Sequence, residues 1–236
     1  TTTETLVFTD VSLHSFKFIG PPFTFGQVRL ATNVQLIGPN AVCSTGAETF
    51  WMANGLFQMY DGVVRNLPCP IRSYIIRILN AAQAQKIYAG VNRAYKEIIF
   101  LMPVNGSEEN NFYVICNYED LGNLTWYYGD YNDAGRTTWL DSWFENYPLA
   151  GAPDGFLYLH DIGATDQSVS PATMLDSWIK SSVFELGNGE NFMLVSRTIP
   201  DVAFLDSTAT TPAVNITFAQ RDYPGSAFVE GPDDPV

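Results

Sequence analysis

"ANGLFQMYDGVV" at residues 53–64 and "PDGFLYLHDIGA" at residues 153–164 are two versions of one pattern, 100 positions apart in the chain. Each copy has a glycine, an apolar run and an aspartate in the same places, in the pairs Gly55 and Gly155, Leu56 and Phe156, Phe57 and Leu157, Met59 and Leu159, Tyr60 and His160, and Asp61 and Asp161. In the first copy Asn54-Gly55 separates two apolar runs. This is a strong signal for a β-hairpin with a type I′ turn, because both residues tolerate positive φ.

Two weaker copies extend the pattern into a candidate repeat. They are "DVSLHSFKF" at 10–18 and "GNLTWYYGD" at 122–130, and they complete a set of four anchor leucines, Leu13, Leu56, Leu124 and Leu157. The anchors are 43, 68 and 33 residues apart, and the middle interval becomes 45 when a helical segment of 23 residues is left out. Intervals of about 40–50 residues are typical of four-stranded propeller blades. The 33-residue interval does not fit, so we expect a degenerate or interrupted repeat.

Short runs of aromatic and β-branched residues, separated by turn residues, predict antiparallel meanders along most of the chain. The runs in the first part of the chain are "AVCST", "ETFWMA" and "LFQMYD" between residues 41 and 61, then residues 95–103, 111–119 and 124–131. Longer runs follow at residues 177–186, 191–204 and 213–223, with Gly187-Asn188-Gly189 as a hairpin turn between the first two. The predicted fold class is mainly β. We expect propeller-like blades over residues 1–170, and over residues 171–236 an antiparallel sheet that closes the propeller or forms a small sandwich.

Residues 70–92 are predicted to be a helical insertion among these strands. Pro68 and Pro70 punctuate its start, and apolar residues then recur at helical spacing, at Ile71, Tyr74, Ile75, Ile78 and Leu79. The segment can also be two helices that break near Asn80. Five cations lie on it or just after it, Arg72, Arg77, Lys86, Arg93 and Lys96. They form either a solvated face or a docking surface for an acidic partner or for passing DNA.

Composition and net charge limit the classes of protein to which the chain can belong. Of 236 residues, 46% are hydrophobic and 14% aromatic while 16% are charged, which argues against disorder and favours sheets with extensive subunit contacts. The net charge of −13 is uneven: residues 1–100 carry +3 and residues 101–236 carry −16. The acidic part is not expected to bind nucleic acid tightly, because phosphate contacts need Lys and Arg. The negative charge of this part either keeps the protein soluble or creates an electrostatic field that has a role in its function.

The remaining compositional signals are weak. Cys43, Cys69 and Cys116 are an odd number without metal-ligand spacing, so we expect buried thiols rather than disulfides or a zinc site. No apolar stretch approaches the ~20 residues of a membrane helix. The chain does not begin with Met, and we expect it to be a fragment or a processed product of a longer protein.

The sequence contains no recognisable enzyme motif. It lacks the GxSxG, P-loop, HExxH and Rossmann patterns, and its two histidines are His14 and His160. His160 takes the place of Tyr60 in the repeat, which indicates a structural strand position. A glycosidase pair could be formed by Asp130 with Asp133 or by Asp154 with Asp161, but aspartates such as Asp61 and Asp161 are typical turn residues. We therefore assign no catalytic, cofactor-binding or metal-binding residue, and we interpret "DYNDAGR" at 130–136 as a plain loop rather than a calcium loop.

Four of the five tryptophans lie between residues 126 and 178. The candidates for a sugar-binding platform are Trp126, Trp139, Trp143 and Trp178 with Tyr127, Tyr128 and Tyr131. The alternative is that they serve the core or subunit interfaces, which is the commoner role of such residues.

Several blocks of the sequence, taken together, resemble a known family. The most specific are "NAVCSTGAETFWMANGLFQMYDG" at 40–62 and "LPCPIRSYI" at 67–75, and further similarity lies in residues 6–27, 112–131, 136–142, 150–163 and 221–225. In this order they resemble tail hub or nozzle proteins of short-tailed bacteriophages, a family also described as stabilising packaged DNA. The resemblance covers most of the chain and corresponds to the C-terminal portion of such proteins.

The resemblance implies a β-propeller protomer in a homo-oligomeric ring, expected to be a hexamer, at the end of a virion tail. The implied partners are further copies of the chain, adaptor or tail-fibre proteins, and genomic DNA that passes without sequence-specific binding. The protein would be assembled in the host cytoplasm and would not be an enzyme. We place the acidic segment on the channel as a hypothesis, because like charge keeps DNA from adhering. The alternatives are a receptor- or carbohydrate-binding module and, less favoured, a propeller glycosidase.

Overall fold

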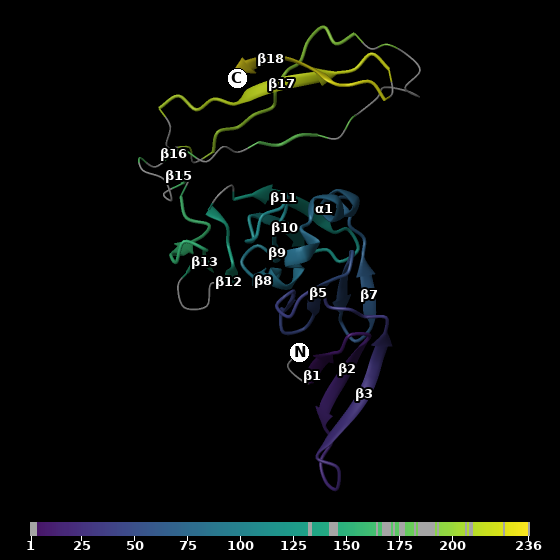
Figure 1. The fold of residues 1–236 in the computed structure, drawn as a ribbon. Coiled ribbons are helices and arrows are strands. Elements are labelled where there is room, and N and C mark those ends of the chain that lie inside the picture. The colour runs from purple at the N-terminus through teal and green to yellow at the C-terminus, as the bar shows by residue number, and fades with distance from the viewer. Residues whose placement is uncertain are drawn as a thin grey trace. The chain divides into compact units, whose positions relative to one another are not determined.

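The computed structural model describes residues 4–131, 134–141 and 146–163, and in the remainder residues 165–166, 171, 173–174, 178–181, 183, 192, 194–205, 207, 210–223 and 225–235. The chain divides into two compact units, residues 1–175 and 176–236 (Figure 1). The fold of the described residues is mainly β, and the sheets are antiparallel, as the sequence predicts.

The first unit is a series of antiparallel meanders in which strands that are neighbours in sequence are also neighbours in the sheet. The first sheet contains β1 (Thr5–Phe8), β2 (Ser12–Phe18) and β3 (Phe25–Thr32). The second contains β4 (Val42–Ser44), β5 (Thr49–Ala53), β6 (Leu56–Tyr60) and β7 (Val64–Leu67). The third contains β8 (Tyr88–Asn92), β9 (Glu97–Met102), β10 (Phe112–Asn117) and β11 (Thr125–Asp130). The fourth contains β12 (Thr138–Leu140), β13 (Leu149–Gly151) and β14 (Leu157–Leu159), and a short pair, β15 (Thr165–Asp166) with β16 (Thr173–Met174), follows.

The third sheet is buried on both of its faces. Side chains alternate between the faces of a strand, so each strand can serve two cores at once. On β9, Ile98, Phe100 and Met102 enter the core shared with the second sheet, whereas Ile99 and Leu101 enter the core that contains Trp139 of the fourth sheet. This explains why β9 is an almost unbroken apolar run instead of an alternating one.

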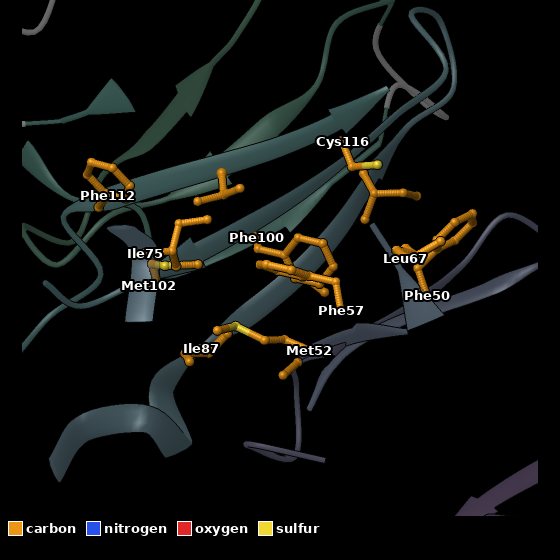
Figure 2. Close-up of a cluster of buried hydrophobic side chains, with 14 of the residues drawn as sticks. Phe50, Met52, Phe57, Leu67, Ile75, Ile87, Phe100, Met102, Phe112 and Cys116 are labelled. Atoms are coloured by element: carbon orange, nitrogen blue, oxygen red, sulfur yellow. The ribbon is translucent and has the colours of Figure 1, made fainter. Parts of the chain in front are cut away.

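Figure 2 shows the core between the second and third sheets, with Phe57 beside Phe100. Their ring centroids are 5.0 Å apart, and Phe57 also lies 4.7 Å from the ring of Trp126 on β11. Burying an aromatic or large aliphatic side chain stabilises a fold by about 1.5–3 kcal/mol, so this cluster supplies much of the stability of the unit. Cys116 is buried in it and behaves as a small apolar residue, and burial raises the pKa of its thiol to about 12.

The second sheet uses its other face to hold the first sheet. Trp51 and Tyr60 belong to a separate buried cluster with Leu13 of β2 and Val34. The indole Nε1 of Trp51 donates to Gln58 Oε1 at 3.0 Å, and a chain of side-chain hydrogen bonds continues from Gln58 across the sheet. The buried polar atoms of Trp51 and Gln58 therefore have partners, as burial demands.

The first strands of three successive meanders lie side by side. β8 packs against β4 and also against β12. Two hydrogen bonds link these edges: Ala89 N donates to Asn40 O at 2.8 Å, just before β4, and Trp139 Nε1 on β12 donates to Val91 O at 3.0 Å. Consecutive meanders are thus joined along their leading strands.

The helical prediction for residues 70–92 is right at its start and wrong at its end. Helix α1 (Arg72–Ile78) buries Ile75, and the chain breaks at Leu79, as expected near Asn80. The 3₁₀ helix η1 (Ala81–Lys86) follows, with Asn80 Oδ1 accepting from Ala82 N at 3.2 Å. Residues 88–92 are strand β8, because pairing with β9 outweighs the local preference.

The repeat is correct for its strong pair and wrong for its weak copies. Leu56 begins β6 and Leu157 begins β14, and each of these strands is the third of its meander after a tight turn. Leu13 instead lies in the second strand of the first sheet, and Leu124 immediately precedes the fourth strand of the third sheet. The spacing of the leucines therefore does not measure a repeat length.

The expected type I′ turn occurs at a different Asn-Gly pair. Gly55 has φ +78°, but Asn54 is not among the residues with positive φ, as in a type II turn. Asn105 (φ +53°) and Gly106 (φ +83°) both have positive φ, and Ser107 N donates to Val104 O across them at 3.0 Å. The hairpin between β5 and β6 is nevertheless formed, with Ala53 opposite Leu56.

The second unit contains one described sheet, in which β17 (Asn215–Gln220) pairs with β18 (Val229–Pro235). β17 lies within the predicted strand at 213–223. The strand predicted at 191–204 is not formed over residues 194–204, which have no regular secondary structure. Gly187-Asn188-Gly189 lies outside the described residues. Several large apolar side chains of this unit are almost fully exposed, including Ile179 (98%) and Leu194 (92%).

Replacing Gly55 by Val is expected to lower the free energy of unfolding by about 1 kcal/mol or more, because a β-branched residue resists positive φ. Space is not the obstacle, since an added Cβ would lie 3.5 Å from Ile76 Cδ1. Gly55→Asn is the matched control and should lose less, because Asn tolerates this conformation. Chemical denaturation measures both, and equal losses for Val and Asn would contradict the backbone explanation.

Candidate functional site

A pocket of about 250 Å³ opens on the face of the third sheet that is turned toward the fourth. We call it the Glu97 pocket, and its lining residues are Asn92, Glu97, Ile99, Tyr113, Ile115, Tyr127, Tyr131, Trp139, His160 and Asp161. All of these residues belong to the first unit of the chain.

Strand register places the inner wall of the pocket. Ile99, Ile115 and Tyr127 lie directly opposite one another on β9, β10 and β11, so their side chains share one face. Asn92 is paired with Glu97 at the ends of β8 and β9, and both lie on the same face. The polar residues of the pocket are thus at the strand ends, where the apolar rows of the sheet stop.

Trp139 forms the outer wall because glycine lets it approach β8 closely. An added Cβ at Gly90 would lie 2.6 Å from Trp139 Cγ, closer than real Cβ contacts allow. The indole is 8% exposed and its Nε1 is occupied by Val91 O. It therefore supplies a fixed aromatic surface rather than a free donor.

Glu97 is held in a setting that opposes its ionisation. Burial raises its pKa, the hydrogen bond from the hydroxyl of Tyr127 lowers it, and the charge of Asp161 raises it again. The net effect is a raised pKa. The hydroxyl of Tyr127 is likewise held protonated, since burial and then the carboxylate of Glu97 raise its pKa.

Asn92 and Asp161 form the second polar pair of the pocket. Asn92 Nδ2 donates to Asp161 Oδ2 at 2.9 Å. Asp161 has φ +61°, a conformation that Asp and Asn adopt more readily than most residues. Asn92 is 4% exposed, and its Oδ1 is buried without a hydrogen-bond partner among the described residues. An orphan acceptor of this kind calls for an explanation, because leaving it unpaired costs about 1–3 kcal/mol.

Arg136 and His160 form a layer beside the pocket. Arg136 Nε donates to His160 Nε2 at 3.0 Å, and its guanidinium lies 4.9 Å from the ring centre of Tyr131 and 4.1 Å from that of Tyr158. Burial and then the charge of Arg136 lower the pKa of His160 to about 4. His160 is therefore neutral near pH 7, and its accepting nitrogen is occupied. It lies just beyond β14 rather than at the strand position predicted from the repeat.

Of the carboxylates proposed from sequence, Asp61 and Asp154 have turn roles, Asp130 ends strand β11, and Asp161 lines the pocket. Asp61 Oδ1 accepts from Val63 N, and its Oδ2 lies 3.3 Å from Arg65 Nη2. Asp154 Oδ1 accepts from Phe156 N at 2.9 Å, and neither Asp154 nor Asp130 lines the pocket. Asp133 lies outside the described residues. The partner of Asp161 in the pocket is Glu97 rather than Asp154.

The aromatic candidates do not form one platform. On β11, Trp126 packs on Phe57 and Tyr128 stacks on Phe112 at 5.6 Å, both toward the core. Tyr127 lines the pocket from the opposite face of that strand, and Tyr131 lines it just beyond the end of β11. Trp139 joins a different cluster from Trp126, and Trp178 belongs to the second unit. Trp143 lies outside the described residues.

His14 is remote from the pocket and makes local contacts. It lies on β2, where its Nε2 is 2.8 Å from Ser12 Oγ and its Nδ1 is 3.0 Å from Gln27 Nε2. Four of the five cations noted in residues 72–96 make contacts within the chain. Arg72 Nε donates to Gly55 O at 2.6 Å, Lys86 pairs with Glu109, Arg93 pairs with Asp141, and Arg77 lies 5.6 Å from the ring centre of Tyr74. These contacts favour the solvated, structural interpretation of that basic segment.

The described residues contain no group of three or more His, Cys, Asp or Glu side chains arranged to hold a metal ion. Their helices include none with the length and apolar character needed to cross a membrane.

Comparison with known proteins gives no relative for this chain. Models of known protein families do not match it, and a search of curated proteins gives no match either. The site is therefore interpreted from its own geometry.

Sequence reasoning missed Glu97 and Asn92 as pocket residues. The available signal was an acid that opens the apolar strand "EIIFLM", in a stretch with no other acid after Asp61. A charged residue beside a fully buried strand is rare enough to mark a site, but its partner Asp161 lies 64 positions further along the chain.

Gly90→Ala is expected to destabilise the first unit by about 2 kcal/mol or more, because the new methyl group overlaps a buried indole. Gly129→Ala is the matched control. Its Cβ would meet the end of Tyr113, with Cζ at 2.5 Å, but that flexible side chain can move. Thermal and chemical unfolding measure both variants, and equal losses would show that the Trp139 contact is not tightly packed.

The free energy of unfolding should decrease as the pH is lowered, because of His160. Its folded-state pKa, about 4, is below the ordinary value of 6.5, so its contribution is complete above pH 6.5 and is lost as the pH falls toward 4. The loss is about 1.4 kcal/mol per pH unit in this window, on the order of 3 kcal/mol in all. His160→Gln should flatten the curve while His14→Gln should not. Parallel curves for wild type and His160→Gln, measured by denaturant titration, would refute the assignment.

Proposed function

We propose that this chain is a structural virion protein of a bacteriophage tail, a nozzle or hub whose copies form a ring that retains and conducts DNA at the tail end. The observation that carries the proposal is the side-by-side arrangement of β4, β8 and β12, the first strands of three successive meanders. In a β-propeller the first strands of neighbouring blades meet around the axis in this way. The sequence resemblance to tail hub and nozzle proteins supports the same interpretation.

The two-sided burial of the third sheet also supports a propeller sector. A blade within a propeller is covered by a neighbour on each face, and this sheet has the second sheet on one face and Trp139 of the fourth on the other. The fourth meander has three strands among the described residues, and the first sheet also has three. The chain would thus contribute some of the blades, and further blades would come from additional chain or from other copies.

Exposed apolar side chains supply surface for assembly. In the second unit Ile179, Phe192 and Leu194 are each more than 90% exposed. Contiguous exposed apolar surface marks protein interaction sites. We assign these three side chains to contacts with neighbouring protomers or tail proteins.

The charge asymmetry supports a conduit. Residues 101–236 carry a net charge of −16, and an acidic wall would let DNA slide without sticking. Under this proposal the acidic residues of the assembled ring line the axial hole. A cryo-EM reconstruction that placed them on the outer rim would remove the charge argument.

A second candidate function is a receptor- or carbohydrate-binding module, and the Glu97 pocket is the observation that favours it. Aromatic walls with two carboxylates occur in sugar sites, and Glu97 with a raised pKa beside Asp161 has the form of a glycosidase acid with its partner. Glycan-array binding tests the module, and hydrolysis lost in Glu97→Gln tests the enzyme.

The proposed nozzle is tested by imaging and weighing the purified protein. Negative-stain electron microscopy should show rings with an axial hole, and native mass spectrometry should give a multiple of the chain mass, six copies for the expected hexamer. A protein that stays monomeric at every concentration tested would overturn the proposal.

Negative charge placed on the exposed apolar side chains of Ile179 and Leu194 should weaken assembly of the ring. Ile179→Asp with Leu194→Asp is expected to shift the mass distribution toward single chains, because both side chains would be buried in the assembly. Val63→Asp is the matched control, at a side chain that is 60% exposed in the first unit. Equal assembly of the wild type, the double variant and Val63→Asp would exclude Ile179 and Leu194 from the interface.

A further inference from the structure

We propose that the Glu97 pocket binds a guanidinium group, with Glu97 and Asp161 as its anionic partners and the tyrosines and Trp139 as its aromatic walls. The inference concerns a ligand site and stands apart from the proposed tail function.

The hydrogen-bond donors and acceptors of the pocket indicate the charge of its ligand. Three polar donors of the pocket are already used: Asn92 Nδ2 on Asp161, the Tyr127 hydroxyl on Glu97, and Trp139 Nε1 on Val91 O. The acceptors that a ligand could use are Asn92 Oδ1, which has no partner among the described residues, and the carboxylate oxygens of Glu97 and Asp161. A ligand that matches such a site carries many donors and a positive charge.

The walls suit a flat cation. Tyr113, Tyr127, Tyr131 and Trp139 surround the pocket with aromatic rings, whose faces attract cations when water is excluded. The chain already holds one guanidinium in this manner, since Arg136 lies 4.9 Å from the ring centre of Tyr131 and 4.1 Å from that of Tyr158. Tyr131 therefore has one face toward an internal arginine and also borders the pocket.

Size and geometry favour guanidinium over other cations. The volume of about 250 Å³ is below the ~300–1,000 Å³ of sites for drug-sized ligands, so it fits a side-chain head group. A guanidinium offers five N–H donors in a planar fork that binds carboxylates in a bidentate way, whereas an ammonium is a compact point charge. Two carboxylates beside the unpaired amide oxygen of Asn92 therefore match a planar guanidinium better than a compact ammonium group.

Charge balance supports the same conclusion. Asp161 opposes the ionisation of Glu97, and both also raise the pKa of Tyr127. A bound cation would remove this mutual repulsion, and it would give the buried Asn92 Oδ1 a partner.

The binding test uses the full chain and a small probe. Isothermal titration calorimetry with N-acetylarginine amide should show saturable binding that weakens as salt rises. N-acetylcitrulline amide has nearly the same shape without the charge and should bind at least about tenfold more weakly, and N-acetyllysine amide should bind more weakly than the arginine probe. Equal binding of the arginine and citrulline probes, or no binding of either, would overturn the proposal.

Variants locate the probe in this pocket. Asp161→Asn keeps the shape and tolerates the positive φ, and Glu97→Gln keeps the volume, so both are expected to fold and to lose at least about tenfold in affinity for the arginine probe. Asp61→Asn is the matched control, since Asp61 is the counterpart of Asp161 in the sequence repeat but bonds Arg65 outside the pocket. Circular dichroism and thermal melting confirm folding. Unchanged affinity in folded Asp161→Asn would refute the site.

The source of the guanidinium is distinguished by assembly state. If it is an arginine of another copy, excess N-acetylarginine amide should reduce the native mass of the wild-type assembly, and Asp161→Asn should assemble poorly without the probe. If it belongs to a separate protein or a free molecule, the probe should bind while the native mass stays constant. Both results require probe binding in the pocket, and the proposed ring can fail while that binding is retained.

Discussion

The structure depends on one constraint, that the sheet of β8–β11 is covered on both faces. A strand such as β9 has apolar side chains on both sides, so exposing either face would place Phe100 or Leu101 in water at a cost of about 1.5–3 kcal/mol for each side chain. The second sheet covers one face with an aromatic cluster around Phe57, and the fourth covers the other with Trp139. The rest of the first unit follows, because a sheet that needs two neighbours imposes a series of packed meanders on the chain.

The same constraint explains where the pocket lies. The fourth sheet has short strands of three residues each, so it cannot cover the whole face of the six-residue strands it opposes. Trp139 covers the centre at Gly90, and the uncovered strand ends carry Asn92 and Glu97. Polar residues are tolerated there because Tyr127 and Asp161 satisfy most of their hydrogen bonds. The orphan Oδ1 of Asn92 is the one described acceptor of this group that the fold leaves buried and unpaired.

Local sequence patterns predicted the meanders, and tertiary contacts decided what they missed. Strands such as β5 and β6 are apolar runs on either side of the Asn54-Gly55 turn, so they could be predicted directly. Strand β8 could not, because "YAGVN" follows a helical run without a turn residue and becomes extended through pairing with β9. Leu13 and Leu124 were misaligned because similar aromatic and apolar residues occur in strands of every position within a meander. The pocket depends on the contact of Asn92 with Asp161, across 69 residues, and no local pattern encodes such a distance. The tail function and the sixfold ring remain proposals that depend on the sequence resemblance.

The pocket and the proposed assembly make opposite demands on the charge of this chain, and the structure suggests how both are met. An acidic wall that repels DNA must stay unpaired along its surface, whereas a guanidinium site must bring two carboxylates to one cavity. Glu97 is half-buried and Asp161 is exposed, and both line a pocket whose other walls are aromatic rings. Acids that face solvent act at long range and are screened by salt, but a carboxylate pair between sheets acts on one group at contact distance. The same residue type can therefore exclude the polyanion from the surface and hold a partner's cation in the pocket.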